Sequence, residues 1–592
     1  MIAMNPIGWR RFSLFVVLAM LALVRWSAHA ASAAELSVDD AMYQDPELNL
    51  PKWRLIFSKK FKPLWLQALD RPDAETRRLA ADTFTIASGR GMTELEDAAD
   101  HLQAVLKADR DPVVRRAAAR ALVALHAKSA AEPLAEAAQQ DGLLMAQIAE
   151  PALARWGDPT LRDAWLQRLE TPDVERGLLM LAIDALGVTR ESQAAARLTS
   201  FVDDGVAPRE VRLAAARALA QIHDTGLTEQ AEKLADRASQ PEFLDRLLAA
   251  NLLARHTDEP SVRLLERLAT DKEPAVAVAA LGRLHTLELR LSLPFAAQAI
   301  VSADAGLRRL GAEILVAKAD VAAVQNLGPL LNDRNPGVRR FVAQQLAEFG
   351  TNEALRPNVL EQAEKVLAQD EWRGLEQAAL VLGRLDHKPA APRLVELLPH
   401  ARGEVAISAA WALRKLRVVE TLPAMLRHAE VLHDAMPKMN APTHSGRQCR
   451  QLCQAFGEMG YREAEPLLRK FVPKNMALDI EARAAACWSL GYFYANQPEN
   501  DLVAPFAERL ADVNSTPPEL PPVRQMVAIG MGRMKAQSQL PLLKKFAGLD
   551  GVSSPPGLAS AWAVEQLTGE KPELMLFRDF GITNWFLEPS EQ

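Results

Sequence analysis

Apolar residues recur at helical spacing along most of the chain, in phrases separated by short polar breaks. In one such phrase, residues 111–125, the apolar side chains of Val114, Ala118, Leu122 and Leu125 stand three or four positions apart. This spacing places them on one face of an amphipathic helix. No stretch alternates between apolar and polar residues as a half-buried strand does. The pattern therefore predicts an all-α protein.

The phrase at residues 111–125 returns along the chain, each time with an arginine near the start of the apolar stripe. The matching arginines are Arg77, Arg115, Arg212, Arg308, Arg339, Arg483 and Arg524. Five of them follow an N-cap residue by four positions, namely Asp73, Asp111, Asp304, Asn335 and Asp479. Successive gaps of 38, 97, 96, 31, 144 and 41 residues correspond to one to four units of about 31 to 41 residues each. About fifteen such units fit between Asp73 and Leu567.

The pattern Asp-Pro-x-Val-Arg-x-Ala-Ala-x-x-Ala-Leu of this phrase resembles the HEAT family, in its short PBS-lyase-like form. The resemblance extends over nearly all of the chain after residue 30. It implies a right-handed α-solenoid of about fifteen stacked antiparallel helix pairs, in which the Asp- and Arg-bearing helices line the concave face. A single helix pair cannot bury its apolar face, whereas a stack of pairs buries a continuous core and needs a cap at each end. The resemblance is highly specific for the fold and only weakly informative about activity, because the repeated residues are packing residues and the family includes scaffolds, adaptors and a few enzymes.

The first thirty residues are typical of a secretory signal peptide. Arg10 and Arg11 precede an uncharged apolar run at residues 12–24, and Ser-Ala-His-Ala at residues 27–30 supplies a cleavage site of the A-x-A type. As a helix the run reaches about 20 Å, whereas a bilayer core needs about 30 Å. We therefore expect cleavage near Ala31 and export to the periplasm or the medium. An uncleaved signal that anchors the protein to a membrane is the alternative.

These patterns divide the chain into six parts: a signal peptide (1–30), lead-in and cap helices (31–72), HEAT-like repeats (73–435), a loop (436–446), further HEAT-like repeats (447–570) and a C-terminal cap segment (571–592).

With 49% apolar and 24% charged residues among 592, the composition is that of a soluble globular protein. Removal of residues 1–30 removes three arginines and no acid, so the formal net charge falls from -6 to -9. Such a charge disfavours nucleic acid as a partner.

The resemblance also implies a structural role for the seven repeated arginines. In HEAT-like repeats the Asp and Arg of neighbouring units form a ladder, and a forked guanidinium suits that contact. Because the arginine recurs at one register position and does not cluster at one place, we interpret it as a ladder residue and not as a binding site.

Three tryptophans share another register position, immediately before an Ala-Leu, Ser-Leu or Ala-Val step: Trp411, Trp488 and Trp562. By the resemblance this position faces or borders the concave groove. Indole rings along a groove could seat a peptide, a glycan or another apolar ligand. The favoured alternative is that each ring packs over the next unit, because the unit with Gln454 and the unit with Gly530 interrupt the tryptophan series.

The cysteines and the histidine near them are the nearest approach to a chemical site. Cys453 and Cys487 occupy equivalent positions of units 34 residues apart, where a disulfide is one interpretation and two small interior residues the favoured one. His444, Cys449 and Cys453 lack the spacing of a zinc site.

Motifs of the common enzyme classes are missing from the sequence. No His is followed by Glu, which argues against the di-iron HEAT hydroxylases, and there is no Walker A loop, G-x-S-x-G or H-E-x-x-H motif. The sequence thus predicts an exported, non-enzymatic scaffold without a cofactor, which binds a protein or extended peptide on its concave face. A cofactor-loading or lyase-type accessory enzyme and a membrane-tethered spacer of the cell envelope are the alternatives.

Overall fold

The computed structural model describes residues 36–48, 61–237, 243–438, 442–550, 554–570 and 572. In these residues the regular elements are all helices, including thirty α-helices from α2 to α31, beside one isolated bridge between Gln44 and Glu47. The prediction of an all-α solenoid of about fifteen helix pairs is confirmed. The signal at residues 1–30 lies outside the described residues, as does the C-terminal cap at residues 571–592 apart from Pro572.

The repeats form two compact units, and the boundary between Ile314 and Leu315 falls inside α17 (Ala305–Lys318). The repeat pattern continues through this point, so the sequence predicts no boundary there. The predicted loop at residues 436–446 corresponds to the connection between α24, which ends at Ala435, and α25, which begins at Ser445. None of the described helices has the length and apolar character needed to cross a bilayer.

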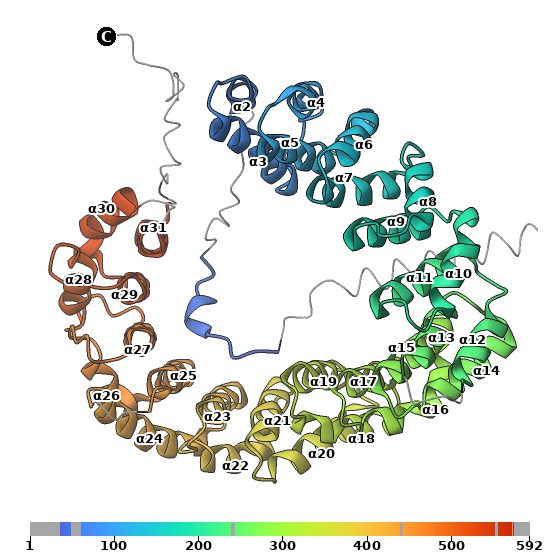
Figure 1. The fold of residues 1–592 in the computed structure, drawn as a ribbon. Helices are drawn as coiled ribbons and strands as arrows, with labels where there is room; N and C mark the ends of the chain where they lie inside the picture. The colour runs from blue at the N-terminus through green and yellow to red at the C-terminus, as the bar shows by residue number, and fades with distance from the viewer. Residues whose placement is uncertain are drawn as a thin grey trace, which may run out of the picture. The chain divides into compact units, whose positions relative to one another are not determined.

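The N-terminal unit consists of two rows of helices (Figure 1). Successive odd-numbered helices pack against one another from α3 to α15. The odd-numbered row comprises α3 (Ala74–Gly89), α5 (Pro112–Ala124), α7 (Leu143–Trp156), α9 (Arg176–Val188), α11 (Arg209–Ile222), α13 (Phe243–Leu252), α15 (Pro274–Leu287) and α17. The even-numbered row comprises α2 (Lys62–Leu69), α4 (Ala98–Ala108), α6 (Ala131–Gln140), α8 (Arg162–Glu170), α10 (Ala195–Asp203), α12 (Thr228–Ala235), α14 (Glu259–Leu268) and α16 (Leu289–Ala299).

The C-terminal unit repeats this arrangement, with odd-numbered helices from α19 to α31 packed in sequence. Its odd-numbered row comprises α19 (Pro336–Phe349), α21 (Trp372–Arg384), α23 (Gly403–Leu416), α25 (Ser445–Glu458), α27 (Ile480–Phe493), α29 (Pro521–Met534) and α31 (Pro555–Thr568). Its even-numbered row comprises α18 (Val321–Leu327), α20 (Arg356–Leu367), α22 (Ala391–Glu396), α24 (Leu422–Ala435), α26 (Glu465–Lys470), α28 (Val503–Ala511) and α30 (Leu540–Asp550).

The odd-numbered helices begin where the sequence pattern predicts. At α3 the side chain of Asp73 accepts a hydrogen bond from the main-chain nitrogen of Thr76, with an N–O distance of 2.7 Å. The same capping is made by all five predicted N-cap residues, Asp73, Asp111, Asp304, Asn335 and Asp479. Each side-chain oxygen satisfies a main-chain N–H that has no partner within the first helical turn.

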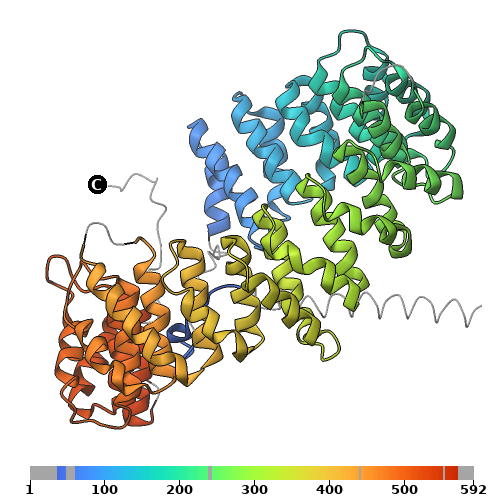
Figure 2. The same ribbon diagram turned by 90° about the horizontal axis from the view of Figure 1, so that it is seen from below.

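A segment from the beginning of the chain, residues 36–48, belongs to the C-terminal unit. It contains the short 3-10 helix η1 (Ala41–Tyr43) and lies beside α23, α25 and α27, as Figure 1 and the perpendicular view in Figure 2 both show. The main-chain nitrogen of its Leu36 donates to Gln344 of α19, 308 positions later. The sequence predicts lead-in and cap helices for residues 31–72. Of these residues, α2 packs against α3 as a cap helix does. Residues 36–48 instead lie against repeats of the C-terminal unit, because the side chains that bind them belong to those repeats.

Candidate peptide-binding face

Four helices of the C-terminal unit, α23, α25, α27 and α29, direct polar side chains toward residues 36–48. We call the surface formed by these side chains the inner face and residues 36–48 the docked segment. The contributing positions repeat in register. One position is occupied by Trp411, Gln454, Trp488, Ile529 and Trp562 in successive units. Arg414 stands three residues after this position in α23, and Arg533 stands four residues after it in α29. Positions three or four apart lie on one side of a helix, so each helix contributes from the same side.

The inner face binds the docked segment through its main chain at every third residue. The carbonyl of Asp39 accepts from Arg414 (2.8 Å) and Gln451 (3.1 Å), and the nitrogen of Met42 donates to Gln454 Oε1 (3.0 Å). The carbonyl of Asp45 accepts from both Trp488 Nε1 and Arg533 Nη2, each at 2.7 Å. The contacted residue moves from Asp39 to Met42 to Asp45 as the partners move from α23 to α29. The main chain of the segment therefore runs along the repeats in the order in which they follow one another.

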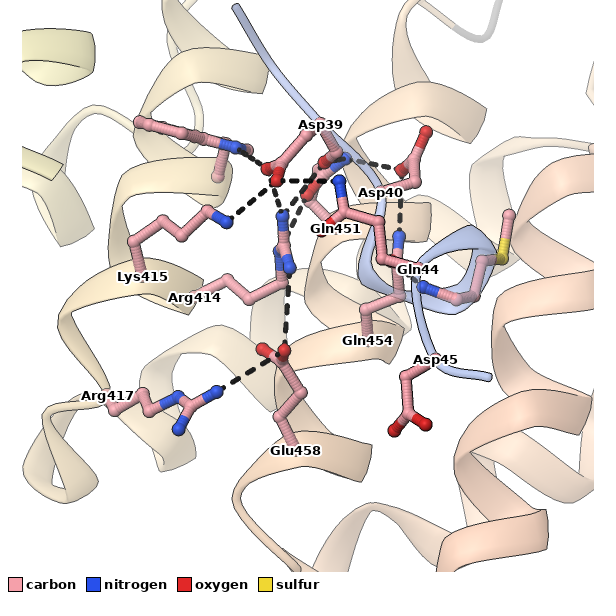
Figure 3. Close-up of polar contacts among 12 residues, drawn as sticks. Asp39, Asp40, Gln44, Asp45, Arg414, Lys415, Arg417, Gln451, Gln454 and Glu458 are labelled. Carbon is pink, nitrogen blue, oxygen red and sulfur yellow. Dashed lines mark hydrogen bonds and ion pairs between the residues drawn. The ribbon is translucent and has the colours of Figure 1, made fainter. Parts of the chain in front are cut away.

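Asp39 makes the most extensive side-chain contacts of the docked segment (Figure 3). Its Oδ1 accepts from Trp411 Nε1 at 2.5 Å and from Arg414 Nη2 at 2.8 Å, while Lys415 Nζ lies 2.8 Å from Oδ2. Partial burial raises the pKa of this carboxyl, but the hydrogen bonds from Lys415 and Trp411 and the charge of Arg414 outweigh it and lower the pKa to about 2. Asp39 is therefore ionised at neutral pH.

The second carboxylate of the segment, Asp40, is held by α25. Its Oδ1 lies 2.7 Å from Gln451 Nε2, 2.9 Å from Gln454 Nε2 and 3.0 Å from Arg450 Nε. Gln451 and Gln454 are fully buried, and buried amides need partners. Each amide thus contacts one carboxylate and one main-chain group of the segment.

Further along the segment one apolar and one phenolic side chain follow. Met42 is fully buried, and the hydroxyl of Tyr43 donates to Glu481 of α27 at 2.6 Å. Burial and the hydrogen bond to Glu481 raise the pKa of Tyr43 well above its ordinary value. The phenol therefore remains a neutral donor.

The segment ends against α27 and α29. Besides its hydrogen bond to the main chain of Asp45, Arg533 lies 3.2 Å from the Asp45 carboxylate and 3.8 Å from the centroid of the Tyr492 ring. Burial lowers the pKa of Arg533 to about 10, so the guanidinium remains charged at neutral pH.

Of the three tryptophans singled out in the sequence, Trp411 and Trp488 combine two roles. The rings of Trp411 and Trp562 lie against the preceding inner helix: a Cβ at Gly383 would come within 2.8 Å of the Trp411 ring, and a Cβ at Gly532 within 2.8 Å of the Trp562 ring. The ring of Trp488 is fully buried. The indole nitrogens of Trp411 and Trp488 nevertheless bind the docked segment. The indole nitrogen of Trp562 has no hydrogen-bond partner among the described residues. Packing and binding, weighed as alternatives from the sequence, coexist at Trp411 and Trp488.

Sequence reasoning missed the residues between these tryptophans. Gln454 interrupts the tryptophan series, yet it donates to Asp40 and accepts from Met42 at the same register position. Arg414 and Arg533 lie one helical turn after the tryptophan position. Comparing the tryptophan position and the position one turn later across all units would have found these polar residues. No motif in residues 36–48 indicated that this segment binds the repeats.

The repeated arginines contact neighbouring repeats, but their acids are not the N-cap residues. Four pairs join successive units: Arg77–Asp109, Arg115–Asp141, Arg212–Asp245 and Arg483–Glu519. The ladder was expected to use the Asp that also caps the helix. Instead Asp109 binds Arg77 while Asp111 caps α5, because the cap carboxylate is already engaged by main-chain N–H groups.

The arginines of the ladder differ in burial and in partners. Arg483 donates to both oxygens of Glu519 at 2.8 Å, and both side chains are 0% exposed. Arg339 lies 3.9 Å from Glu376 and 5.5 Å from the Trp372 ring centroid. The remaining two also contact carbonyls: Arg308 those of Ser302 and Ala303, and Arg524 that of Leu510.

The cysteines form no bridge, so the disulfide considered between Cys453 and Cys487 is not present. All three cysteines are free and buried. The Sγ of Cys453 lies 4.0 Å from that of Cys449, one turn earlier in α25, while Cys487 belongs to α27. His444 stands immediately before α25, and no group of three or more His, Cys, Asp or Glu positioned to hold a metal ion occurs among the described residues.

Comparisons with known proteins agree with this architecture. The model of the PBS lyase HEAT-like repeat matches residues 114–140, which extend through α5 and α6. No curated protein matches the chain. Among solved structures, that of Kap95p, whose binding induces the switch loops of RanGDP to adopt the GTP-bound conformation, is 14% identical with a TM-score of 0.50, and the match covers 86% of this chain and 72% of that one.

Two further solved structures are similar at lower scores. Importin beta is 14% identical with a TM-score of 0.44 over 86% of this chain and 71% of that one. Kap121p bound to Nup53p is 11% identical with a TM-score of 0.45 over 86% and 57% of the two chains. The similarity to Kap95p and the matched repeat define the class: the protein is an α-solenoid of HEAT-like repeats.

Proposed function

We propose that this protein is an exported, non-enzymatic scaffold that holds an extended segment of another protein along the inner face of its C-terminal unit. The observation that carries the proposal is the docked segment itself. Side chains from α23, α25, α27 and α29 bind its main chain at Asp39, Met42 and Asp45. A surface that binds one extended chain in this way has the chemistry to bind another.

The composition of the inner face supports a binding role. Trp and Arg are the residues that most often dominate the free energy of protein interfaces, and here Trp411, Arg414, Trp488 and Arg533 stand in successive contacts with the docked segment. The contacts to main-chain groups do not depend on the side chains of the bound segment. They set its direction and extended form, while the charged contacts add selectivity.

Export is the part of the proposal that rests on residues 1–30. The mature protein is expected to begin at or near Ala31, which mass spectrometry of the protein purified from the producing cell will test. Recovery of the intact Met1 form in a membrane fraction would contradict export in soluble form and favour the membrane-tethered spacer.

A photocrosslinking experiment in the native compartment tests the scaffold role. Trp562 is replaced with benzoylphenylalanine, because its indole lies in the register of the inner face and has no hydrogen-bond partner among the described residues. The matched control carries the same amino acid at Val431, which is 64% exposed on α24 of the other row.

We expect a distinct protein adduct from position 562 whose crosslinked site maps to an extended segment of the partner. Adducts that arise equally from positions 431 and 562, or from position 431 alone, would contradict binding at the inner face. A small-molecule cofactor on position 562 in place of a protein would favour the accessory-enzyme alternative.

A further inference from the structure

We infer that the inner face selects an acidic extended segment with two adjacent carboxylates followed two residues later by a methionine-like side chain, and that residues 36–48 occupy it in cis until a partner segment of this kind displaces them. This inference rests on the proposed function, since it names the chemistry of the partner and the device that regulates access to the same face.

The charge of the inner face is the first argument. Four cations, Arg414, Lys415, Arg450 and Arg533, lie within 3.2 Å of a carboxylate of the docked segment. Two acidic residues, Glu458 and Glu481, lie near these cations, and each already contacts other groups. Glu458 lies 3.6 Å from Arg414 and 3.4 Å from Arg417 (Figure 3), and Glu481 accepts from Tyr43 and lies 3.7 Å from Arg450. The face therefore complements a segment with several negative charges.

The burial of its polar groups is the second argument. Arg414 is 1% exposed and Gln451 and Gln454 are 0% exposed, and each of the three directs a nitrogen to an oxygen of Asp39 or Asp40. A neutral segment would still offer its main-chain carbonyl to Arg414 and Gln451, and Gln454 would keep the carbonyl of Arg450. It would offer no anion to the buried guanidinium of Arg414 or to Arg450, and hydrogen bonds to charged groups are about twice as strong as neutral ones. Two adjacent carboxylates supply these charges.

The methionine position sets the spacing. Met42 follows Asp40 by two residues and is fully buried, and its main-chain nitrogen is fixed by Gln454. The carboxylate of Asp40 and the main chain of Met42 thus both contact α25, while the carboxylate of Asp39 contacts α23. A flexible, unbranched side chain suits such a site.

The docked segment is suited to exchange. Of its thirteen residues only Ala41 and Met42 are buried, whereas the apolar cores of the repeats are built from contacts among the helices themselves. The segment is thus held mainly by polar contacts, for which water can substitute on release. Covalent linkage gives it a high effective concentration, so a partner must match its chemistry to compete.

The experiment measures binding of a fluorescein-labelled peptide with the sequence of residues 36–48 to the full mature chain, by fluorescence anisotropy. The wild type is compared with the Asp39→Ala/Met42→Ala variant, whose own segment is weakened. We expect the variant to bind the peptide at least tenfold more tightly than the wild type. A peptide with Asn in place of Asp39 and Asp40 should bind the same variant about tenfold or more weakly.

Adding Arg414→Ala to the segment variant should also remove peptide binding, which places the peptide on the inner face. Helicity by circular dichroism and a cooperative unfolding transition establish that each variant is folded. A second approach leaves the docked segment unaltered and inserts a protease site after Asn49, so that cleavage removes the covalent link between the segment and the repeats. Cleavage should allow the labelled peptide to exchange into the face.

Equal peptide binding by wild type and segment variant, no exchange after cleavage, or equal affinity for the Asn peptide would each overturn the inference. The scaffold proposal fails separately. If the peptide binds as expected but position 562 yields no partner adduct, the scaffold role is wrong and the acid-selective face remains. If a partner is crosslinked but excess peptide does not reduce the adduct, the scaffold role remains and this inference is wrong.

Discussion

The indole nitrogen of Trp488 donates a hydrogen bond to the main-chain carbonyl of Asp45, 443 positions earlier, with an N–O distance of 2.7 Å. The ring of Trp488 is itself fully buried and contacts Tyr492 and Arg533. One side chain therefore packs in the repeat core and binds the docked segment. This dual use explains why register alone could not decide between a packing and a binding role for the tryptophans.

The two roles can be separated by substitution. In the Trp411→Phe/Trp488→Phe variant an aromatic ring remains but both N–H donors are lost. Asp39 Oδ1 keeps its hydrogen bond from Arg414 and the Asp45 carbonyl keeps that from Arg533, so each lost hydrogen bond costs about 0.5 to 1.5 kcal/mol. We expect faster amide hydrogen exchange across residues 36–48, with the helical signal unchanged. Trp562→Phe is the matched control and should alter neither, because its indole nitrogen has no partner among the described residues.

Replacing Trp411, Trp488 and Trp562 together with Ala should instead lower the stability of the C-terminal unit. Each large ring removed from a packed layer costs about 3 to 5 kcal/mol, so we expect an early unfolding transition or aggregation on heating. A triple variant with normal stability and normal binding of the labelled peptide would contradict both roles.

The ladder arginines should differ in their contribution to stability. Arg483→Ala removes both hydrogen bonds to the Glu519 carboxylate in a site where neither side chain is exposed, and leaves Arg509 at 3.7 Å from it. Breaking a buried pair of this kind costs about 3 to 5 kcal/mol. Arg339→Ala removes longer contacts, to Glu376 at 3.9 Å and to the carbonyls of Asp333 and Arg334 at 3.5 and 3.4 Å, and should cost about 1 to 3 kcal/mol.

Urea denaturation of the two variants beside the wild type checks this order. An Arg483→Met/Glu519→Leu variant should recover most of the loss, because an apolar pair of similar volume avoids the buried charge. A larger loss for Arg339→Ala than for Arg483→Ala would show that burial of the acid does not set the energetics of the ladder. An unchanged midpoint of Arg339→Ala together with lost peptide binding would make Arg339 a site residue.

Docking of the segment should weaken in acid. The pKa of Asp39 in the folded protein is lowered to about 2, against about 3.9 for an unfolded aspartate. A depressed pKa contributes stability above the unfolded value, and that contribution is lost as the pH falls through the folded value. We therefore expect the midpoint difference between wild type and Asp39→Asn to be constant above about pH 5 and to shrink from about pH 4 toward pH 2.

Thermal unfolding of both proteins across this range gives the difference directly, since groups common to both cancel. A difference that persists unchanged to pH 2, or one that grows with acid, would contradict the contacts of Asp39 with Arg414, Lys415 and Trp411.

The cysteines should be unreactive in the folded protein. Burial raises the pKa of Cys487 to about 12, and the contact with Cys449 together with burial raises the pKa of Cys453. Because the thiolate is the reactive form, a thiol reagent at pH 8 should label none of the three in the native state. After denaturation without reductant it should label all three. One labelled thiol in place of three would show a disulfide in the protein.

The repeat architecture could be predicted because its determinants are local. A helix pair and its neighbour lie within one repeat length, so the apolar stripe, the N-cap at Asp111 and the following Arg115 are all visible in one short phrase. The number of helix pairs and the start of each capped helix followed from that phrase. The division into two units at residue 314 could not be predicted in the same way, because the repeat pattern is continuous across it.

The binding of residues 36–48 to the inner face depends on contacts that the repeat pattern does not predict. Asp39 meets Trp411 across 372 positions and Met42 meets Gln454 across 412, and neither partner carries a local mark of the other. Residues 36–48 contain no repeat phrase, so the sequence alone offered only a lead-in segment. Tertiary structure brings their carboxylates to Arg414 and Gln451 because buried polar groups on a stacked helix face require partners from outside their own repeat.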